Sequence, residues 1–239
     1  MEEAPPTGEW NEEDREAFKI PIENRRNFIK KVLGIISAQM FVTTVITAVV
    51  MAWEDSNDWF EAHWWIVFIF LVMMIIPELM LICCRNTFAR KVPINYILLL
   101  IFTLGTSGCV AMICSSYQPL SVLLVAILTT GLTCLLTAFA IYTDTDFTKA
   151  IWVVLGFSCL LSIVGLILMF VDVPRGVAIL ISCLWLIIYG VFLIIDVQAL
   201  AGGKKYSFSE EDYIVAALQI YLDVIMMFLE LLKLLGKAK

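Results

Sequence analysis

Seven long apolar runs dominate this sequence, and their length limits how the chain can fold. Their approximate limits are residues 32–53, 64–84, 95–116, 119–142, 150–171, 177–200 and 213–235. A helix rises 1.5 Å per residue, so each run can cross a hydrocarbon core about 30 Å thick. The runs are too long for the strands of a membrane barrel. We therefore predict an all-α membrane protein with a bundle of seven transmembrane helices.

Composition supports this prediction and narrows the classes of partner. Of the 239 residues, 61% are hydrophobic and 16% are charged, whereas a soluble domain has about 45–50% apolar and about 25% charged residues. The net charge is −6, and the basic residues occur in short clusters between apolar runs. We therefore expect membrane lipid as the surrounding partner and no nucleic acid.

The basic residues of the loops orient the predicted bundle. Seven antiparallel spans would place ten of them on one side of the membrane: Arg25, Arg26, Lys30, Lys31, Arg85, Arg90, Lys91, Lys149, Lys204 and Lys205. Because cytosolic segments collect Lys and Arg, we expect the N-terminus in the cytosol and, after seven spans, the C-terminus on the far side. Lys237 and Lys239 favour a cytosolic C-terminus instead, which a re-entrant last span would provide.

Polarity divides the chain into three parts. Residues 1–27 form an acidic cytosolic tail that includes three prolines. Residues 28–236 form the seven-transmembrane domain, and residues 237–239 form a short C-terminal tail.

Two aspartates, Asp196 and Asp223, lie inside the sixth and seventh apolar runs. An ionisable side chain in a transmembrane helix costs about 2.5–3.5 kcal/mol on insertion scales, so it marks a functional site by default. Antiparallel packing of the two spans would bring both carboxylates to a similar depth. Two carboxylates in a low dielectric cannot both ionise cheaply, so they would share a proton or a cation. The alternative is that each forms separate structural hydrogen bonds between helices.

Other polar residues of the spans extend this candidate site. Gln219, Asp223 and Glu230 follow spacings of four and seven, so they share one face of the last span. Such a stripe is typical of a pore lining, and its oxygens are ligands that calcium prefers. For Glu230, an i,i+3 pair with Lys233 is the alternative. Glu78 follows Pro77, which should break or kink the second span, and would either bind a cation there or pair near Arg85.

A pair of aspartates also occurs outside the spans. Asp144 and Asp146 lie in the loop after the fourth span and predict a turn that caps the fifth helix.

Several stretches resemble the Lifeguard branch of the transmembrane Bax-inhibitor-motif family. They are RNFIKKVLGIISAQMFVTT before and within the first span, RKVPINYILLLIFTL (90–104), SSYQPLSVLL (115–124), AIYTDTDFT (140–148) and GGKKYSFSEEDYIVAALQIYLDVIMMFLELL (202–232). The resemblance covers roughly residues 25–236, with all spans in order, and the last block is its most specific part.

This resemblance implies a compact bundle in which six helices surround the C-terminal one. It also implies a pH-sensitive calcium leak through which members restrain cell death. In this sequence Asp196 and Asp223 would be the proton-sensing dyad, and Glu211 or Asp212 the acidic residue linked to ion conduction. An arginine near the end of the second span is the family's alternative partner for the first dyad aspartate, and both Arg85 and Arg90 match that position.

The sequence departs from the family pattern beside the dyad, in the loop before the last span, where Glu210 replaces a frequent proline, and in the N-terminal tail. Val197 follows Asp196 where relatives usually have threonine, which removes a hydroxyl beside the dyad. The N-terminal tail is short and acidic, whereas Lifeguard proteins typically have a long tail rich in proline and glycine. Partner binding through that tail is therefore not expected to carry over.

We predict a multi-pass calcium leak channel that inhibits apoptosis, with calcium as the transported ion, Asp196 and Asp223 as its ligands, and no cofactor. The alternative is a non-conducting protein that docks to apoptosis-regulating membrane proteins or receptor complexes. We do not expect an enzyme: intramembrane aspartyl proteases require Gly-x-Gly before the second aspartate, and here the text is IYLDVI. The resemblance favours the endoplasmic reticulum or Golgi, with the plasma and mitochondrial membranes as alternatives.

Overall fold

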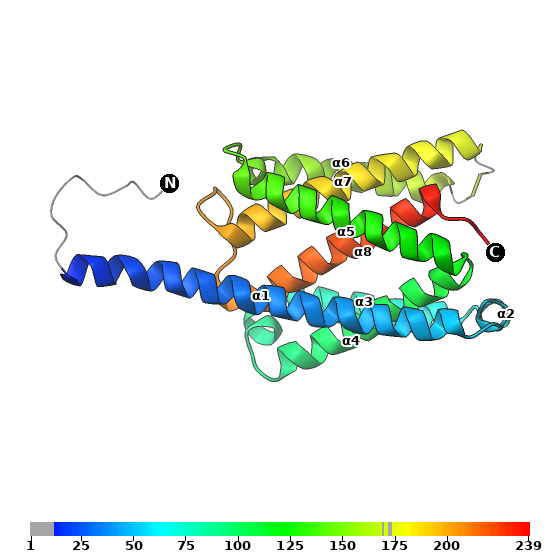
Figure 1. Cartoon of the computed structure of the whole chain (residues 1–239), viewed down its shortest axis with the longest axis horizontal. Coiled ribbons are helices and arrows are strands. Elements are labelled where there is room, and N and C mark those ends of the chain that lie inside the picture. The colour runs from blue at the N-terminus through cyan, green and yellow to red at the C-terminus, as the bar shows by residue number, and fades with distance from the viewer. Residues whose placement is uncertain (1–11, 169, 172–173) are drawn as a thin grey trace.

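The structure is a computed structural model that describes residues 12–168, 170–171 and 174–239, with side chains described from residue 24 onward. It is a bundle of long helices (Figure 1). In chain order the elements are α1 (Glu12–Ala52), α2 (Ser56–Ala62), α3 (Ile66–Cys83), the π-helical turn η1 (Arg85–Ala89), α4 (Ile94–Ser115), α5 (Pro119–Tyr142), the 3₁₀ turn η2 (Phe147–Ala150), α6 (Ile151–Leu168), α7 (Arg175–Ala201), the 3₁₀ turn η3 (Glu210–Asp212) and α8 (Tyr213–Leu235).

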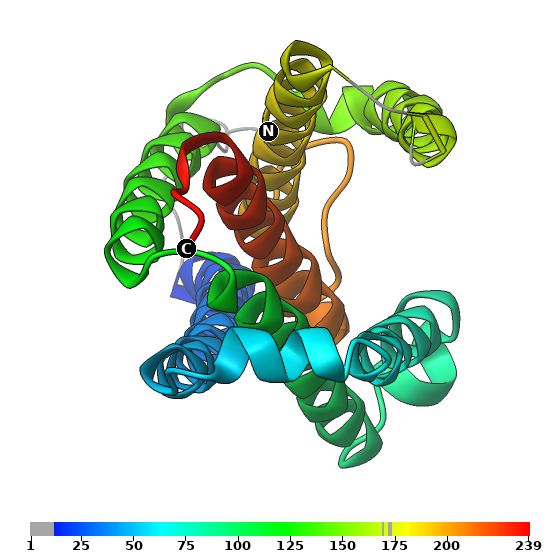
Figure 2. The same cartoon turned by 90° about the vertical axis from the view of Figure 1, so that its right-hand side faces the viewer.

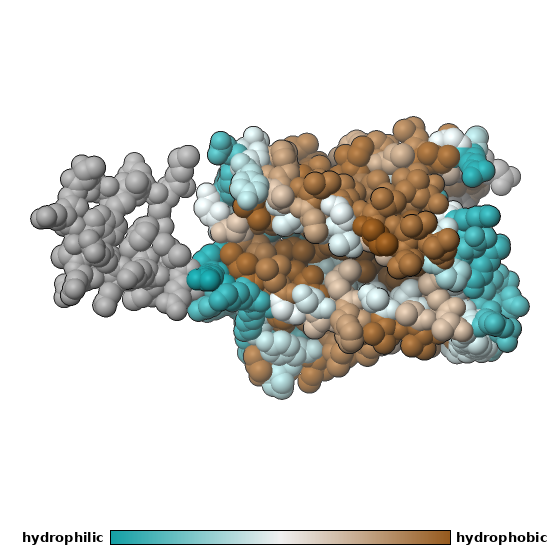
Figure 3. All heavy atoms as spheres, in the orientation of Figure 1, coloured by the Kyte–Doolittle hydropathy of each residue, from teal (hydrophilic) through white to brown (hydrophobic). Residues whose placement is uncertain are grey.

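Seven helical segments of the described chain are long and apolar enough to cross a membrane. Many large apolar side chains are exposed on them, and they form a broad hydrophobic belt between hydrophilic ends (Figure 3). Exposed apolar surface of this extent marks an interaction surface, and a belt of it around membrane-length helices is typical of a protein surrounded by lipid. The predicted class, an all-α protein with seven membrane-spanning helices, is confirmed.

The predicted span limits agree with the helices to different degrees. The limits 119–142 and 213–235 coincide with α5 and α8. Helix α1 begins earlier than the first apolar run, at Glu12, so residues 12–27 of the predicted tail are helical. Residues 1–11 of that tail lie outside the described residues. Helix α3 continues through Pro77, so the helix is not broken there, and a kink at this proline stays a prediction.

The spans form two groups with α8 running obliquely between them (Figures 1 and 2). One group contains α1, α3 and α4, and the other contains α5, α6 and α7. Helix α8 packs against α1, α3, α4, α5 and α7, whereas α6 packs mainly on α7. Of the most apolar stretch of the last span, 72% is buried inside the protein, which is the highest share among the seven spans. That all six other spans surround α8 stays a prediction, since α6 lies at the outer edge in Figure 2.

Hydrogen bonds between α1, α4 and α8 lie in the interior. The Thr43 hydroxyl shares hydrogen bonds of 2.7 Å with Tyr221 and 2.9 Å with Ser107. The Tyr221 side chain is fully buried. In an apolar interior each of these groups needs a partner, so the three side chains fix α8 against both helices.

The C-terminal tail lies at the end of the bundle opposite the start of the first span (Figure 1). The Gln118 amide donates to the Lys237 carbonyl at 2.9 Å, and the Lys239 amide donates to the Ser116 carbonyl at 3.0 Å. Helix α8 therefore crosses the whole bundle, and the re-entrant alternative for the last span is wrong. Which end faces the cytosol remains a prediction from the loop charges.

Candidate functional site

The dyad aspartates lie in the contact between α7 and α8. Asp196 is 5% exposed and Asp223 is 8% exposed. Helices α7 and α8 pack along each other, and the two carboxylates lie close enough for one charge to act on the other. Oδ2 of Asp223 is buried without a hydrogen-bond partner in the described chain. The two buried acids therefore lie near each other, and no ion pair to either of them occurs among the described residues.

A stripe of polar side chains runs along α8 and includes Asp223. Its members, Asp212, Gln219, Asp223 and Glu230, are spaced by seven, four and seven residues. At about 100° per residue, all four lie within about 20° of one line along the helix. Oxygens of Gln219 and Glu230 are also buried without hydrogen-bond partners in the described chain. The stripe is therefore a buried row of acceptors, which is unfavourable unless a proton, water or cation satisfies it.

One end of the stripe is covered by arginines. Asp212 is buried at the start of α8, where Nε of Arg90 donates to its Oδ1 at 3.0 Å and Nη1 of Arg85 lies 3.5 Å from its Oδ2. Nη1 of Arg90 also lies 2.8 Å from Oε2 of the exposed Glu211. The hydrogen bond to Asp212 raises the pKa of Arg90.

The expected pairing of Asp196 with an arginine stays a prediction. Both candidate arginines, Arg85 and Arg90, bind Asp212 instead, because η1 and η3 bring them together at the same end of the bundle. No ion pair to Asp196 occurs among the described residues.

The other end of the stripe carries a lysine. Nζ of Lys233 donates to Oε1 of Glu230 at 2.7 Å, so the i,i+3 pair considered as the alternative for Glu230 is confirmed. Lys233 is half exposed, whereas the Glu230 side chain is buried. Basic side chains thus cover both ends of the acidic stripe.

Tyr189 also belongs to this site, a placement that is not predicted in the sequence analysis above. Its side chain lies close enough to Glu230 and Asp223 for electrostatic interaction with both carboxylates. Its ring stacks on that of Trp185, with ring centroids 5.3 Å apart. Tyr189 and Asp196 are seven residues apart on α7 and therefore share a face. That spacing was the available signal, but a tyrosine in an apolar run is commonly only a packing residue.

Gln198 is a second residue whose part in the site was not anticipated. It is 1% exposed, and its Nε2 donates to the carbonyls of Ala140 and Thr145 at 3.3 and 2.9 Å. Its Oε1 accepts a 2.9 Å hydrogen bond from the Phe147 amide. Gln198 therefore holds the α5–α6 connection against α7, two residues from Asp196.

The same connection contains the predicted helix cap. Oδ1 of Asp146 accepts a 3.1 Å hydrogen bond from the Thr148 amide at the start of η2, so the capping prediction is confirmed for Asp146. The hydrogen bond from the Thr148 side chain is the main cause that lowers the pKa of Asp146.

Glu78 lies apart from these contacts. It is half-buried on α3 and forms no ion pair among the described residues. Its expected neighbour Arg85 binds Asp212. Neither its predicted cation contact nor its pairing at the membrane face is tested by these contacts.

The donor set limits what the dyad can hold. Among the described residues no three His, Cys, Asp or Glu side chains are grouped to bind a metal ion. Asp196 and Asp223 together offer about four carboxylate oxygens, whereas calcium takes 6–8 oxygen ligands. Water or backbone carbonyls would have to complete the coordination shell of the ion. Such an incomplete set of protein ligands suits an ion that passes through better than one that stays bound.

Known proteins match this chain over most of its length. Residues 25–239 match a family model described as inhibitor of apoptosis-promoting Bax1. Protein lifeguard 3 of Homo sapiens is 32% identical over 232 residues, which cover 96% of this chain and 71% of the relative. Protein lifeguard 3 of Mus musculus is 30% identical, with 96% and 72% covered. Protein LIFEGUARD 4 of Arabidopsis thaliana is 30% identical, with 91% and 87% covered.

Proposed function

This chain belongs to the Bax-inhibitor family and its Lifeguard branch, and we propose that it is a pH-sensitive calcium leak channel that restrains apoptosis. It is an integral, multi-pass membrane protein of that family. The observation that carries the proposal is the buried pair Asp196 and Asp223, which has no basic partner in the described chain.

The acidic stripe of α8 supports a cation route. Its carboxylate and amide oxygens are hard ligands suited to calcium. An ion that entered near Glu211 and Asp212 would meet Gln219 and then Asp223 along one helix face, and it would leave near Glu230. The stripe lies in the bundle interior, where an ion needs such oxygens in place of its hydration shell.

The ion pairs at the two ends of the stripe supply the barrier. Arg85 and Arg90 hold Asp212, and Lys233 holds Glu230. A positive side chain at each entrance repels a divalent cation and occupies the acid that would otherwise bind it. Conduction therefore requires these pairs to separate, which limits the flux to a slow leak.

Proton binding at the dyad supplies the pH dependence. When Asp196 and Asp223 share a proton, the pair carries one negative charge, and further protonation removes it. Loss of charge weakens cation attraction in a medium of low dielectric. Deprotonation has the opposite effect, because two repelling carboxylates recruit a cation or move α7 relative to α8.

The cellular role follows from the leak. A slow release lowers the calcium content of a store, and a smaller store delivers a smaller death signal. We place the protein in the endoplasmic reticulum or Golgi. Imaging of a tagged copy tests this placement against the plasma and mitochondrial membranes.

Calcium flux from liposomes tests the proposal. Purified protein is reconstituted into vesicles loaded with a calcium indicator, and entry is followed for the wild type, Asp223→Asn and the control Asp144→Asn, which neutralises an exposed loop acid. We expect flux for the wild type and the control, and little for Asp223→Asn. Wild-type flux no greater than that of empty vesicles would overturn the channel. If cell protection survived in Asp223→Asn without flux, the non-conducting interaction protein would replace it.

A further inference from the structure

Two adjacent cysteines, Cys83 and Cys84, end α3 where it meets the polar turn η1. Cys83 is the last residue of the helix, and Cys84 follows it with its backbone amide donating to the Met80 carbonyl at 3.2 Å. Both side chains are exposed, and both thiols are free. Because cysteine is among the residue types most often buried, packing of the bundle does not explain this cysteine pair.

Position separates the cysteine pair from the rest of the thiols. The other five cysteines lie inside membrane spans: Cys109, Cys114, Cys134, Cys159 and Cys183. Of these only Cys134 and Cys159 are exposed. Each lies eight residues from the nearer end of its helix, or about 12 Å, which is deep in a hydrocarbon core about 30 Å thick. Only the cysteine pair therefore combines exposed thiols with a place at the membrane boundary.

The surroundings of the cysteine pair are those of a polar membrane face. The second span ends at Cys83, and the following turn and loop contain the basic residues Arg85, Arg90 and Lys91. The loop charges predict this face to be cytosolic. A thiol at such a boundary can meet a reactant from water, while a chain attached to it enters the bilayer. Juxtamembrane cysteines in this setting are typical sites of S-acylation.

Helix α3 also offers a surface beside which an attached chain can lie. Leu79 and Ile76 come four and seven residues before Cys83 and share its face, and Val72 continues that face into the membrane. These three side chains are 54%, 52% and 54% exposed. A chain on Cys83 would run beside this uncovered aliphatic surface, so it would not have to displace another helix.

We propose that Cys83 and Cys84 form a site of S-acylation whose acyl donor is a long-chain acyl-CoA. The thiolate sulfur is the nucleophile, and it forms a bond to the carbonyl carbon of the donor thioester. The bond between that carbon and the CoA sulfur breaks, and CoA leaves as a thiol with the proton that the cysteine gives up. One thioester replaces another, so the step needs no oxidant or reductant.

The acyl chain would anchor the turn that covers the polar stripe. Arg85 follows Cys84 directly, and its Nη1 lies 3.5 Å from Oδ2 of Asp212. S-acylation is reversible, so the anchor could be added to this turn and removed from it. Regulation of the leak by this anchor rests on the proposed function, whereas the modification itself does not, and its test measures no flux.

Metabolic labelling of the full-length protein with an alkyne analogue of palmitate tests the site. The protein is isolated from cultured human cells, coupled to a fluorophore, and treated with neutral hydroxylamine, which cleaves thioesters and leaves amides intact. We expect hydroxylamine to remove the label of the wild type, and we expect only background in the double variant Cys83→Ser with Cys84→Ser. No hydroxylamine-sensitive label on the wild type, or undiminished label on the double variant, would overturn the proposal.

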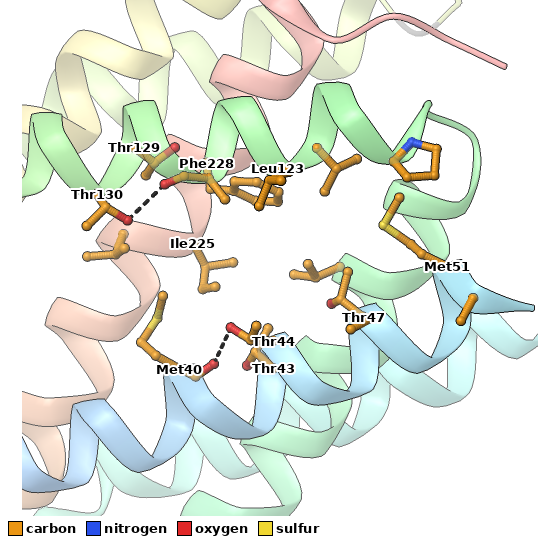
Figure 4. A pocket seen from close by; sticks show the side chains of 17 residues that line it. Met40, Thr43, Thr44, Thr47, Met51, Leu123, Thr129, Thr130, Ile225 and Phe228 are labelled. Atoms are coloured by element: carbon orange, nitrogen blue, oxygen red, sulfur yellow. Dashed lines mark hydrogen bonds between the residues drawn. The ribbon is translucent and has the colours of Figure 1, made fainter.

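Two control variants distinguish position from exposure. Cys134→Ser with Cys159→Ser removes the exposed thiols of the membrane interior and should keep the wild-type label. Thr44 is also exposed, in the wall of an apolar groove between α1 and α5 (Figure 4). It lies eight residues, or about 12 Å, from the end of α1. Thr44→Cys, added to the double variant, places an exposed thiol at that depth and should not restore the label.

Each result of these controls bears on the assignment. Label restored by Thr44→Cys would show that exposure alone is sufficient and would contradict a site defined by the membrane boundary. Label lost in the variant of Cys134 and Cys159 would move the site into the bundle. Melting curves establish that each variant is folded, and Cys83→Ala with Cys84→Ala replaces the serine pair if that pair fails to fold.

Discussion

Arg90 and Asp212 lie 122 residues apart in the chain and meet through a 3.0 Å hydrogen bond from Nε to Oδ1. This contact joins the turn between α3 and α4 to the first residue before α8. Because Asp212 is buried and heads the polar stripe, the contact both stabilises the start of α8 and covers one entrance of the proposed ion route.

Replacing Arg90 with Gln should weaken this end of the bundle. Asp212 would keep only the 3.5 Å contact with Arg85, so its buried charge would be poorly compensated. We expect a melting temperature lower by a few degrees and a faster calcium leak in liposomes. Lys91→Gln is the matched control, since it removes the same charge from the same loop and Lys91 forms no ion pair among the described residues. Equal leak rates in the two variants would contradict a gating part for Arg90.

Replacing Tyr221 with Phe should destabilise the bundle, although it leaves the packing of the aromatic ring unchanged. The change removes the hydroxyl that shares a hydrogen bond with Thr43 and leaves the ring against Phe102. Hydrogen bonds between membrane helices contribute about 0.6 kcal/mol on average and at most about 1.7 kcal/mol, and we expect a loss in that range. Thr44→Val is the control, because its hydroxyl bonds only within α1. Unfolding in mixed micelles measures both, and an equal loss in the two variants would refute the interhelical contribution.

Adding a methyl group to α4 should separate it from α3. A Cβ at Gly105 would lie 2.9 Å from the backbone carbon of Met73 and from the backbone nitrogen of Met74, and one at Gly108 would lie 2.6 Å from the ring of Phe70. Overpacking costs about 1–3 kcal/mol, and we expect Gly105→Ala to cost more, because backbone moves less readily than a side chain. Gly131→Ala should be neutral or stabilising, since nothing lies within 4 Å of its Cβ position. A stable Gly105→Ala variant would contradict this close approach.

The Asp146 cap should make the α5–α6 connection sensitive to acid. Its pKa lies below the usual value of 3.8, mainly because the Thr148 side chain donates to the carboxylate. A carboxyl group with a lowered pKa stabilises the folded state above its ordinary pKa, and that contribution is lost as the pH falls through the lowered value. The stability difference between wild type and Asp146→Asn should thus be constant above about pH 5 and shrink below about pH 4. A difference that stayed constant to pH 3 would contradict this cap.

The spans could be predicted from the sequence because their ends are marked by polar residues. The loops SSYQP and YTDTD enclose residues 119–142, and these limits are those of α5. Before the first span there is no such mark. The acidic residues from Glu12 onward can face water in a helix as well as in an irregular tail. The helical extension of α1 could therefore not be predicted from polarity.

The polar stripe could be predicted in part, because spacing along one helix fixes a face. Gln219, Asp223 and Glu230 were found in this way, and the Glu230 pair with Lys233 follows from the same geometry. The partner of Arg90 could not be found, because it depends on where two loops meet in space. Gln198 presented a different difficulty: an amide in an apolar run needs partners, but the sequence does not say which carbonyls supply them.

The pH profile of calcium flux in Asp196→Asn liposomes tests the central claim most directly. Wild-type flux should fall as the pH falls, since protonation removes the charge that attracts the cation, and the exposed-acid control Asp144→Asn should follow the same profile. In Asp196→Asn the shared proton site is gone, so the flux should be low and independent of pH. A pH profile in Asp196→Asn that matched the wild type would contradict the assignment of Asp196 and Asp223 as the proton-sensing pair.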